Sequence, residues 1–261
     1  MPSDSHRPPD KRPHVARRRF GQHFLHDPGV IRKIVEAIAP AAEDFIVEIG
    51  PGQGVLTFPL AERVRRLEVI EIDRDLAAAL PGDRIKVHVA DALEFDFGVF
   101  PNGVRIVGNL PYNISTPLLF HVARYADRVR DMHFMLQLEV VERMVAKPST
   151  PEYGRLSVML QTRFRMEKLF RVAPGAFRPP PKVDSAVVRM VPLGTPLGCD
   201  EKRFEDVVRG AFSARRKTLR NALPLGPEDY AALGIDPKLR PENLSPQDYV
   251  RVAQRTILAR G

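Results

Sequence analysis

The segment FIVEIGPGQGVLTFPLAERV, Phe45 to Val64, decides the fold of this chain. It begins with an apolar run typical of a buried strand, turns on three glycines and continues as a helix-like run. The same alternation is repeated downstream through RLEVIEID, RDLAAAL, IKVHVADAL, VRIVGNL, TPLLFHVARYA and MHFMLQL. Strands that are apolar almost throughout and separated by helices indicate a parallel sheet covered on both faces. We therefore expect a doubly wound α/β fold.

The rest of the chain predicts a hairpin and then a small helical domain. Two long strand-like runs, TRFRMEKLFRV and SAVVRMV, flank the loop APGAFRPPPKVD, whose three consecutive prolines exclude a helix. The hairpin would complete a sheet domain over 21–192. A Pro- and Gly-rich stretch predicts a linker over 193–200, and helix-like runs predict an all-helical domain over 201–261. The first of those runs, FEDVVRGAFSARRKTLRNAL, is expected to form one helix.

Composition narrows the class of protein. The 261 residues include 40 Lys or Arg and 32 Asp or Glu, which gives a net charge of +8. Cys199 is the only cysteine, so a disulfide framework and a cysteine metal cluster are excluded, and we expect a reducing compartment, the cytoplasm. No apolar run is long enough to span a membrane, and the seven histidines are too scattered to predict a metal site. Six basic side chains among several prolines predict a disordered basic arm over 1–20.

The glycine-rich turn VEIGPGQG predicts a ligand site at the carboxyl end of the first strand. Gly50, Gly52 and Gly54 allow a tight turn and the close approach of a ligand to the backbone. A nicotinamide dinucleotide would require glycine where this chain has Val55, and Pro51 removes a donor that a pyrophosphate would use. The turn therefore argues against an oxidoreductase of that kind.

Two acidic side chains stand at the ends of the next two strands. VIEID places Glu71 twenty-one residues after Gly50, where a carboxylate can accept hydrogen bonds from both ribose hydroxyls of an adenosine. VADAL places Asp91 at the same sheet edge, where it can accept the exocyclic amine of adenine. Either acid alone could be a solvated strand end, but together they predict an adenosine pocket, in which Ile72 and Ala92 are included.

The segment NLPYNIS is the most specific signal in the chain. Asn109 offers a neutral carbonyl acceptor, Pro111 stiffens the turn after Leu110, and Tyr112 offers a stacking surface. An ordinary turn is the alternative. Because the lone pair of an adenine N6 is delocalised into the ring, acceptors that hold its hydrogens out of plane would direct that pair toward an electrophile. The electrophile implied is a sulfonium methyl, and we predict transfer without a metal.

These motifs resemble those of the ribosomal RNA adenine N6-dimethyltransferases, most closely the group that acts on the small subunit. The resemblance runs from GQHFLHD, beginning at Gly21, through FRPPPKVDSAV to AFSARRKTLRNAL, ending at Leu223. It implies a Rossmann-like class I S-adenosylmethionine-dependent methyltransferase with a small C-terminal all-helical domain. The implied reaction is dimethylation of two adjacent adenines in the 3′-terminal hairpin of small-subunit (16S) rRNA, within a pre-ribosomal particle. We expect a monomer.

The resemblance also implies roles for single residues. A segment like GQHFL covers the methionine end of the cofactor, which makes His23 and Leu25 cofactor contacts; the family often has Asn where this chain has His23. Gly50 is implied to contact the methionine portion, and Asn109 both the cofactor and the target amine. Tyr112 and Phe177, the latter in the proline-rich loop, are implied to sandwich the target adenine.

Basic residues cluster where the helical domain begins. Five of them fall within twelve residues that contain no acid: Arg209, Arg215, Arg216, Lys217 and Arg220. This cluster suits RNA phosphates, and a solvated helix face is the alternative. The region 163–189 adds seven basic and two acidic side chains, so the two regions could form one cationic strip.

Two other functions remain open from the sequence. The related enzymes that dimethylate large-subunit RNA and confer macrolide resistance share NLPYNIS, whereas AFSARRKTLRNAL and YGRLSVMLQ favour the small-subunit group. A ribosome-assembly factor that binds RNA, with methylation incidental, belongs to a different class. The presence of Glu71, Asp91 and Asn109 favours an enzyme over such a factor.

Overall fold

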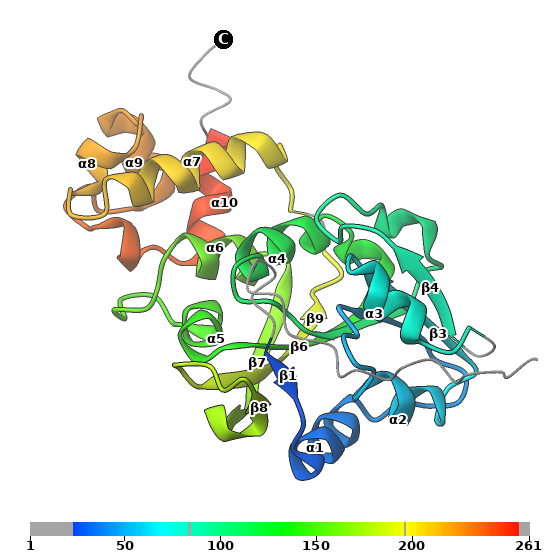
Figure 1. Cartoon of the computed structure of the whole chain (residues 1–261). Helices are drawn as coiled ribbons and strands as arrows, with labels where there is room; N and C mark the ends of the chain where they lie inside the picture. Colours follow the sequence, from blue (N-terminus) through cyan, green and yellow to red (C-terminus); the bar gives the residue numbers. More distant parts are fainter. Residues whose placement is uncertain (1–22, 83–84, 196, 256–261) are drawn as a thin grey trace, which may run out of the picture.

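The computed structural model describes residues 23–82, 85–195 and 197–255. The expected basic arm over 1–20 and the end of the last expected helix lie outside these residues. Figure 1 shows a central sheet flanked by helices, with a further group of helices toward the C-terminus. Every helix in the described part of the chain is too short or too polar to cross a membrane.

The main sheet has seven strands in the order β4-β3-β2-β5-β6-β9-β7. Five of them are parallel: β2 (Phe45–Ile49), β3 (Arg66–Glu71), β4 (Ile85–Val89), β5 (Val104–Asn109) and β6 (Val129–Gln137). The last two, β7 (Phe164–Val172) and β9 (Ser185–Pro192), pair antiparallel with each other, and β9 also pairs antiparallel with β6. The expected doubly wound sheet and its closing hairpin are therefore confirmed.

The order of the strands reverses beside β2, which pairs with β3 on one side and with β5 on the other. The chain first builds outward to β4 and then returns to add β5 and β6. In open parallel sheets, such a reversal leaves a crevice at the carboxyl ends of the two central strands, because their following loops turn in opposite directions. The glycine turn after β2 and the NLPY segment after β5 both open into that crevice.

Helices cover both faces of the sheet because the strands are apolar on both. Ile46 and Val47, successive residues of β2, pack into different apolar clusters. One cluster includes residues of α4 (Ser115–Ala123), α5 (Leu138–Val145) and α6 (Arg155–Gln161). The other includes residues of α1 (Pro28–Ile38) and α2 (Thr57–Ala61), whereas α3 (Arg74–Ala79) packs beside β3 and β4. Each crossover helix therefore buries its apolar side on the sheet.

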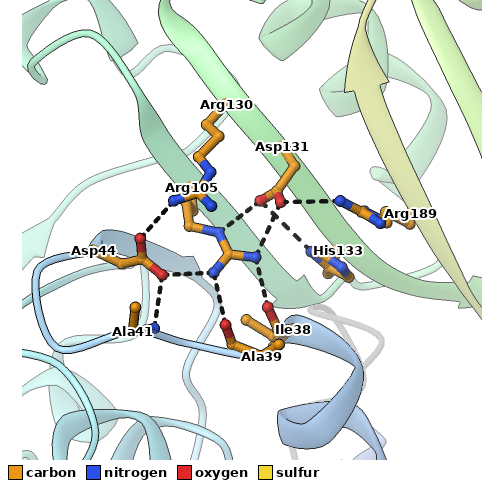
Figure 2. Close-up of polar contacts among 9 residues, drawn as sticks. All are labelled: Ile38, Ala39, Ala41, Asp44, Arg105, Arg130, Asp131, His133 and Arg189. Carbon is orange, nitrogen blue, oxygen red and sulfur yellow. Dashed lines mark hydrogen bonds and ion pairs between the residues drawn. The ribbon is translucent and has the colours of Figure 1, made fainter.

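A buried arginine fastens α1 to the sheet (Figure 2). Arg105 of β5 donates through Nη2 to the carbonyl oxygen of Ile38 at 2.6 Å, which satisfies one of the last carbonyls of α1. The same guanidinium contacts Asp44 at 2.7 Å and Asp131 at 2.8 Å, and all three side chains are almost fully buried. His133, two residues beyond Asp131 on β6, lies at 3.8 Å from that carboxylate.

The C-terminal helices are α7 (Glu201–Ser213), α8 (Leu219–Ala222), α9 (Pro227–Leu233) and α10 (Pro246–Arg255). The prediction of one continuous helix from Phe204 to Leu223 is wrong, because the helix stops before Ala214. The buried positions of α7, Phe204, Val207, Val208 and Ala211, recur at helical spacing, and the next positions on that side are Ala214 and the charged Arg215. A continued helix would have buried that charge.

The helical group shares its core with the sheet domain. Phe204 and Val252 pack in one apolar cluster with Tyr153 and Val158, which belong to the segment around α6. The buried hydroxyl of Tyr153 donates to the carbonyl oxygen of Leu244 at 2.9 Å. The division into domains at 192 and 201 stays a prediction, and the core of the helices is completed by residues from before that division.

Candidate active site

One pocket gathers nearly all of the residues predicted for catalysis and cofactor binding. It lies at the carboxyl ends of β2, β3, β4 and β5. The predicted residues that line it are His23, Leu25, Gly50, Gly52, Glu71, Ile72, Asp91, Ala92, Asn109, Leu110, Pro111 and Tyr112. Phe177 is the one member of the predicted set that does not line this pocket.

The glycine turn leaves open space where a ligand can approach the backbone. Gly50 has a φ of +65°, a conformation that side chains disfavour, and a Cβ added there would meet no atom within 4 Å. Gly54 has a φ of +80°, and a Cβ there would lie 2.7 Å from the ring of Phe58. Gly50 thus faces an open space, whereas Gly54 permits the close packing of the turn against α2.

A buried carboxylate, Glu71, and a half-buried one, Asp91, shape the wall beside this turn. Glu71, only 5% exposed, accepts hydrogen bonds from the backbone N–H groups of Gly52 at 3.2 Å and Asp73 at 2.9 Å. Burial raises the pKa of Glu71, and these backbone donors offset part of that shift. Asp91 accepts the N–H of Leu93 through Oδ1 at 2.9 Å, which holds the carboxylate just beyond the end of β4.

Glu48 is a pocket residue that was not predicted from the sequence. It is 2% exposed on β2, and its Oε2 has no hydrogen-bond partner among the described residues. Burial raises the pKa of Glu48 to about 7, with a further contribution from the Glu71 carboxylate. A buried oxygen without a partner is costly, and two donors could satisfy it: the neighbouring Thr57 hydroxyl, whose hydrogen bond lowers the pKa of Glu48, or a group of a bound ligand. The signal was present as a lone acid within the apolar run FIVEI.

The NLPY segment places its amide at the mouth of the pocket. Asn109 ends β5 and donates through Nδ2 to the carbonyl oxygen of His23 at 3.3 Å, which leaves its Oδ1 as an acceptor. The Tyr112 hydroxyl is hydrogen-bonded to the Ser185 hydroxyl at 2.6 Å. Burial raises the pKa of Tyr112, so this side chain stays a neutral phenol. The amide oxygen and the aromatic ring that the sequence predicted thus lie in one wall.

The N-terminal segment crosses the pocket as a short strand. β1 (Phe24–Leu25) pairs antiparallel with β8 (Phe177–Arg178), and the ring of Phe24 lies 3.3 Å from the position of a Cβ on Gly52. Leu25 is 1% exposed and packs in the core beneath. His23 turns its ring toward the proline-rich loop, where Nδ1 lies 2.8 Å from the carbonyl oxygen of Pro179.

The structure places Phe177 in the apolar core. It is 2% exposed and packs in the same cluster as Leu25 and Val187. Its pairing with β1 turns the ring inward, and the proline-stiffened loop begins only after it, which the sequence reasoning did not anticipate. Stacking on a target base would require this side chain to leave the core, so that role stays a prediction.

The predicted RNA-binding residues lie on α7, on α8 and on the turn between them, not on one helix. Arg209 pairs with Asp206 on the same helix, and Arg215 donates to the carbonyl oxygen of Pro151 at 2.8 Å. All five side chains are exposed, including Arg209 and Arg215. Their RNA contacts stay a prediction.

The expected cationic strip over 163–189 is partly neutralised by intramolecular ion pairs. Arg163 contacts Glu201 at 2.7 Å, and Lys168 contacts Glu142 at 3.5 Å. Arg171 pairs with Asp184. Among the described residues, no group of His, Cys, Asp and Glu side chains could hold a metal ion.

Solved structures with the same fold define the class. A dimethyladenosine transferase from Plasmodium falciparum superposes with a TM-score of 0.78 at 25% identity, covering 88% of this chain and 96% of that one. The 23S rRNA methyltransferase ErmE superposes with a TM-score of 0.69 at 28% identity, covering 89% of this chain and 98% of that one. The protein described here is a class I S-adenosylmethionine-dependent methyltransferase.

The sequence comparisons narrow this class to one family. Residues 13–257 match the family Ribosomal RNA adenine dimethylase, and the chain belongs to it. A Ribosomal RNA small subunit methyltransferase A from Nitrosospira multiformis is 59% identical over 247 residues, 92% of this chain and 95% of the relative. Another from Thiobacillus denitrificans is 58% identical, over 90% of this chain and 96% of the relative.

Proposed function

We propose that this protein dimethylates N6 of two adjacent adenines in the 3′-terminal hairpin of small-subunit ribosomal RNA. The observation that carries the proposal is the orientation of the Asn109 amide. Its Nδ2 donates to the carbonyl oxygen of His23, so its Oδ1 can accept a hydrogen bond from an amine beside the glycine turn. The names of the relatives at 58–59% identity support the small subunit as the substrate. The fold alone does not separate this substrate from the large subunit, because ErmE shares it.

The pocket fits S-adenosylmethionine. The open space at Gly50 and the buried, unpartnered oxygen of Glu48 are features that an extended ligand with a donor group would fill. Glu71 would accept the ribose hydroxyls and Asp91 the adenine amine, with Ile72 and Ala92 beside them. When bound, the cofactor supplies an electrophilic methyl group on a sulfonium.

The residues after β5 would prepare the target amine. Asn109 Oδ1 would accept a hydrogen from N6, which holds the amine out of the ring plane and localises its lone pair. Leu110 donates its N–H to the carbonyl oxygen of Met135 at 3.1 Å, which fixes the turn that Pro111 stiffens. Tyr112, neutral and tied to Ser185, would stack on the base. The proton displaced from the amine would pass to water, so no side chain need act as a base.

The exposed cations of the turn after α7 would bind the RNA backbone. Arg216 and Lys217 lie on this turn and Arg220 follows on α8; Arg209 and Arg215 are exposed as well, but they already have partners within the protein. Phosphate contacts of this kind position folded RNA without reading its sequence, while an unpaired adenine enters the pocket. We further propose that the enzyme acts as a monomer in the cytoplasm, on a pre-ribosomal particle.

The test is methyl transfer with nucleoside analysis. Labelled S-adenosylmethionine is supplied with small subunits that lack the two dimethyladenosines and, separately, with large-subunit RNA. We expect dimethyladenosine only in the small-subunit RNA, and its loss in Asn109→Ala. Product in large-subunit RNA would assign the protein to the resistance group, and tight RNA binding without transfer to either would favour an assembly factor.

A further inference from the structure

His23 contacts Asn109 and Tyr112, the two residues proposed to hold the target base. Its backbone carbonyl accepts from the Asn109 amide at 3.3 Å. Its ring stacks on Tyr112 with the centroids 5.6 Å apart and the planes at 30°. Its Nδ1 lies 2.8 Å from the carbonyl oxygen of Pro179. One residue thus touches the acceptor amide, the aromatic ring and the proline-rich loop.

The three contacts orient the Asn109 amide, support the Tyr112 ring and hold the loop that follows Arg178. The bond from Asn109 Nδ2 to the His23 carbonyl decides which way the amide points, and so presents Oδ1 to the target amine. The stacked ring supports Tyr112 on one face, while Ser185 holds its hydroxyl. The bond to Pro179 extends the β1·β8 pairing by one step, from Phe24 to the loop that follows Arg178.

We propose that His23 is a positioning residue of the target-base site, and not primarily a ligand of the cofactor. This inference rests on the proposed function, because it assumes that an adenine amine reaches Asn109. An imidazole with a hydrogen on Nδ1 donates to the carbonyl oxygen of Pro179 and stacks through its ring, so the residue combines a donor with an aromatic face.

The two properties of the imidazole can be separated by substitution. In His23→Asn, the amide nitrogen stands near the place of Nδ1 and keeps the donor to Pro179, but the stacking ring is lost. In His23→Phe, the ring is kept and the donor is lost. His23→Ala removes both. The matched control is His121→Phe, which removes a similar ring-to-carbonyl bond, from Nε2 to Phe95 at 2.8 Å, outside the pocket.

The experiment measures kcat and KM on unmethylated small subunits, and the Kd of S-adenosylhomocysteine by calorimetry. We expect His23→Asn and His23→Phe each to lower kcat about fivefold, and His23→Ala to lower it by about the product of the two effects. The Kd of S-adenosylhomocysteine should stay within about twofold in all three variants. His121→Phe should leave kcat unchanged, although its Tm falls.

Two results would overturn the proposal. A loss of S-adenosylhomocysteine affinity of tenfold or more in His23→Ala, with kcat unchanged at saturating cofactor, would make His23 a cofactor ligand. If all three His23 variants lose the same fraction of kcat and show the same fall in Tm, His23 would be only a structural residue. Wild-type enzyme that forms no dimethyladenosine in this assay would refute the proposed function instead, so the two failures are distinguishable.

Discussion

Replacing Arg105 with Met should destabilise the protein more than any exposed charge substitution. The guanidinium lies between Asp44 and Asp131, whose side chains are 7% and 4% exposed, and it also satisfies the carbonyl oxygen of Ile38. Met fills a similar length without charge, so both carboxylates lose their main partner while they remain buried. Removing one partner of a buried ion pair costs about 3–5 kcal/mol of unfolding free energy. For a chain of this size, that lowers Tm by about 6–20 °C.

The matched control is Arg130→Met. Arg130 contacts the other oxygen of Asp44 at the same 2.8 Å distance that joins Arg105 to Asp131, but its side chain is 61% exposed. Water screens such a pair, so we expect a loss of about 1 kcal/mol or less. Urea unfolding followed by circular dichroism gives both values at pH 7, provided that the slope against urea is the same in each variant.

A double variant tests whether the buried carboxylates left without a partner cause the loss of stability. Arg105→Met combined with Asp131→Leu removes one of the orphaned carboxylates, so it should recover part of the stability that Arg105→Met alone loses. The reasoning fails if Arg105→Met costs no more than Arg130→Met. It also fails if the double variant is less stable than Arg105→Met, because then the buried carboxylate was not the source of the loss.

Three further predictions follow from the charges of other side chains. Burial lowers the pKa of His133 to about 4, so protonation of this side chain disfavours the folded state. The free energy of unfolding should therefore fall by about 3 kcal/mol at most as the pH drops from 6.5 through 4, and urea titrations of His133→Phe should show no such fall. Glu48 has a pKa of about 7, and its ionised form would attract the cationic amine that S-adenosylmethionine and S-adenosylhomocysteine share, so the affinity for S-adenosylhomocysteine should rise as the pH increases through 7. Calorimetry that finds the same pH dependence in Glu48→Gln would contradict this. Arg216→Ala and Lys217→Ala should each weaken RNA binding and reduce the slope of log Kd against log salt by about 1, whereas Arg209→Ala, already paired with Asp206, should change it less.

The sequence predicted those parts of the site that strand ends determine. Glu71, Asp91 and Asn109 each follow an apolar run, and a parallel sheet brings the carboxyl ends of such runs to one edge. The composition of the runs therefore located the pocket without any knowledge of contacts. The break before Ala214 was not predicted, although a continued helix would have placed Arg215 on the buried side of α7.

The parts that were not predicted depend on pairings across the chain. β1 and β8 have two residues each, and the register that joins Phe24 to Arg178 leaves no local pattern. That pairing is what turns Phe177 into the core and brings His23 to Pro179. Glu48 was missed for a different reason, since a single acid in a strand shows its cost only when the burial around it is known.

The core that α6 shares with the C-terminal helices holds those helices in one position relative to the sheet. Tyr153 and Phe204 cannot separate without exposing both, so the cations after α7 and the amide of Asn109 stay at one distance from each other. If two neighbouring adenines are modified in turn, the enzyme cannot stretch to reach the second. If these cations hold the RNA backbone as proposed, the RNA would have to advance by one nucleotide, either by releasing its backbone from them or by flexing between the two points of contact.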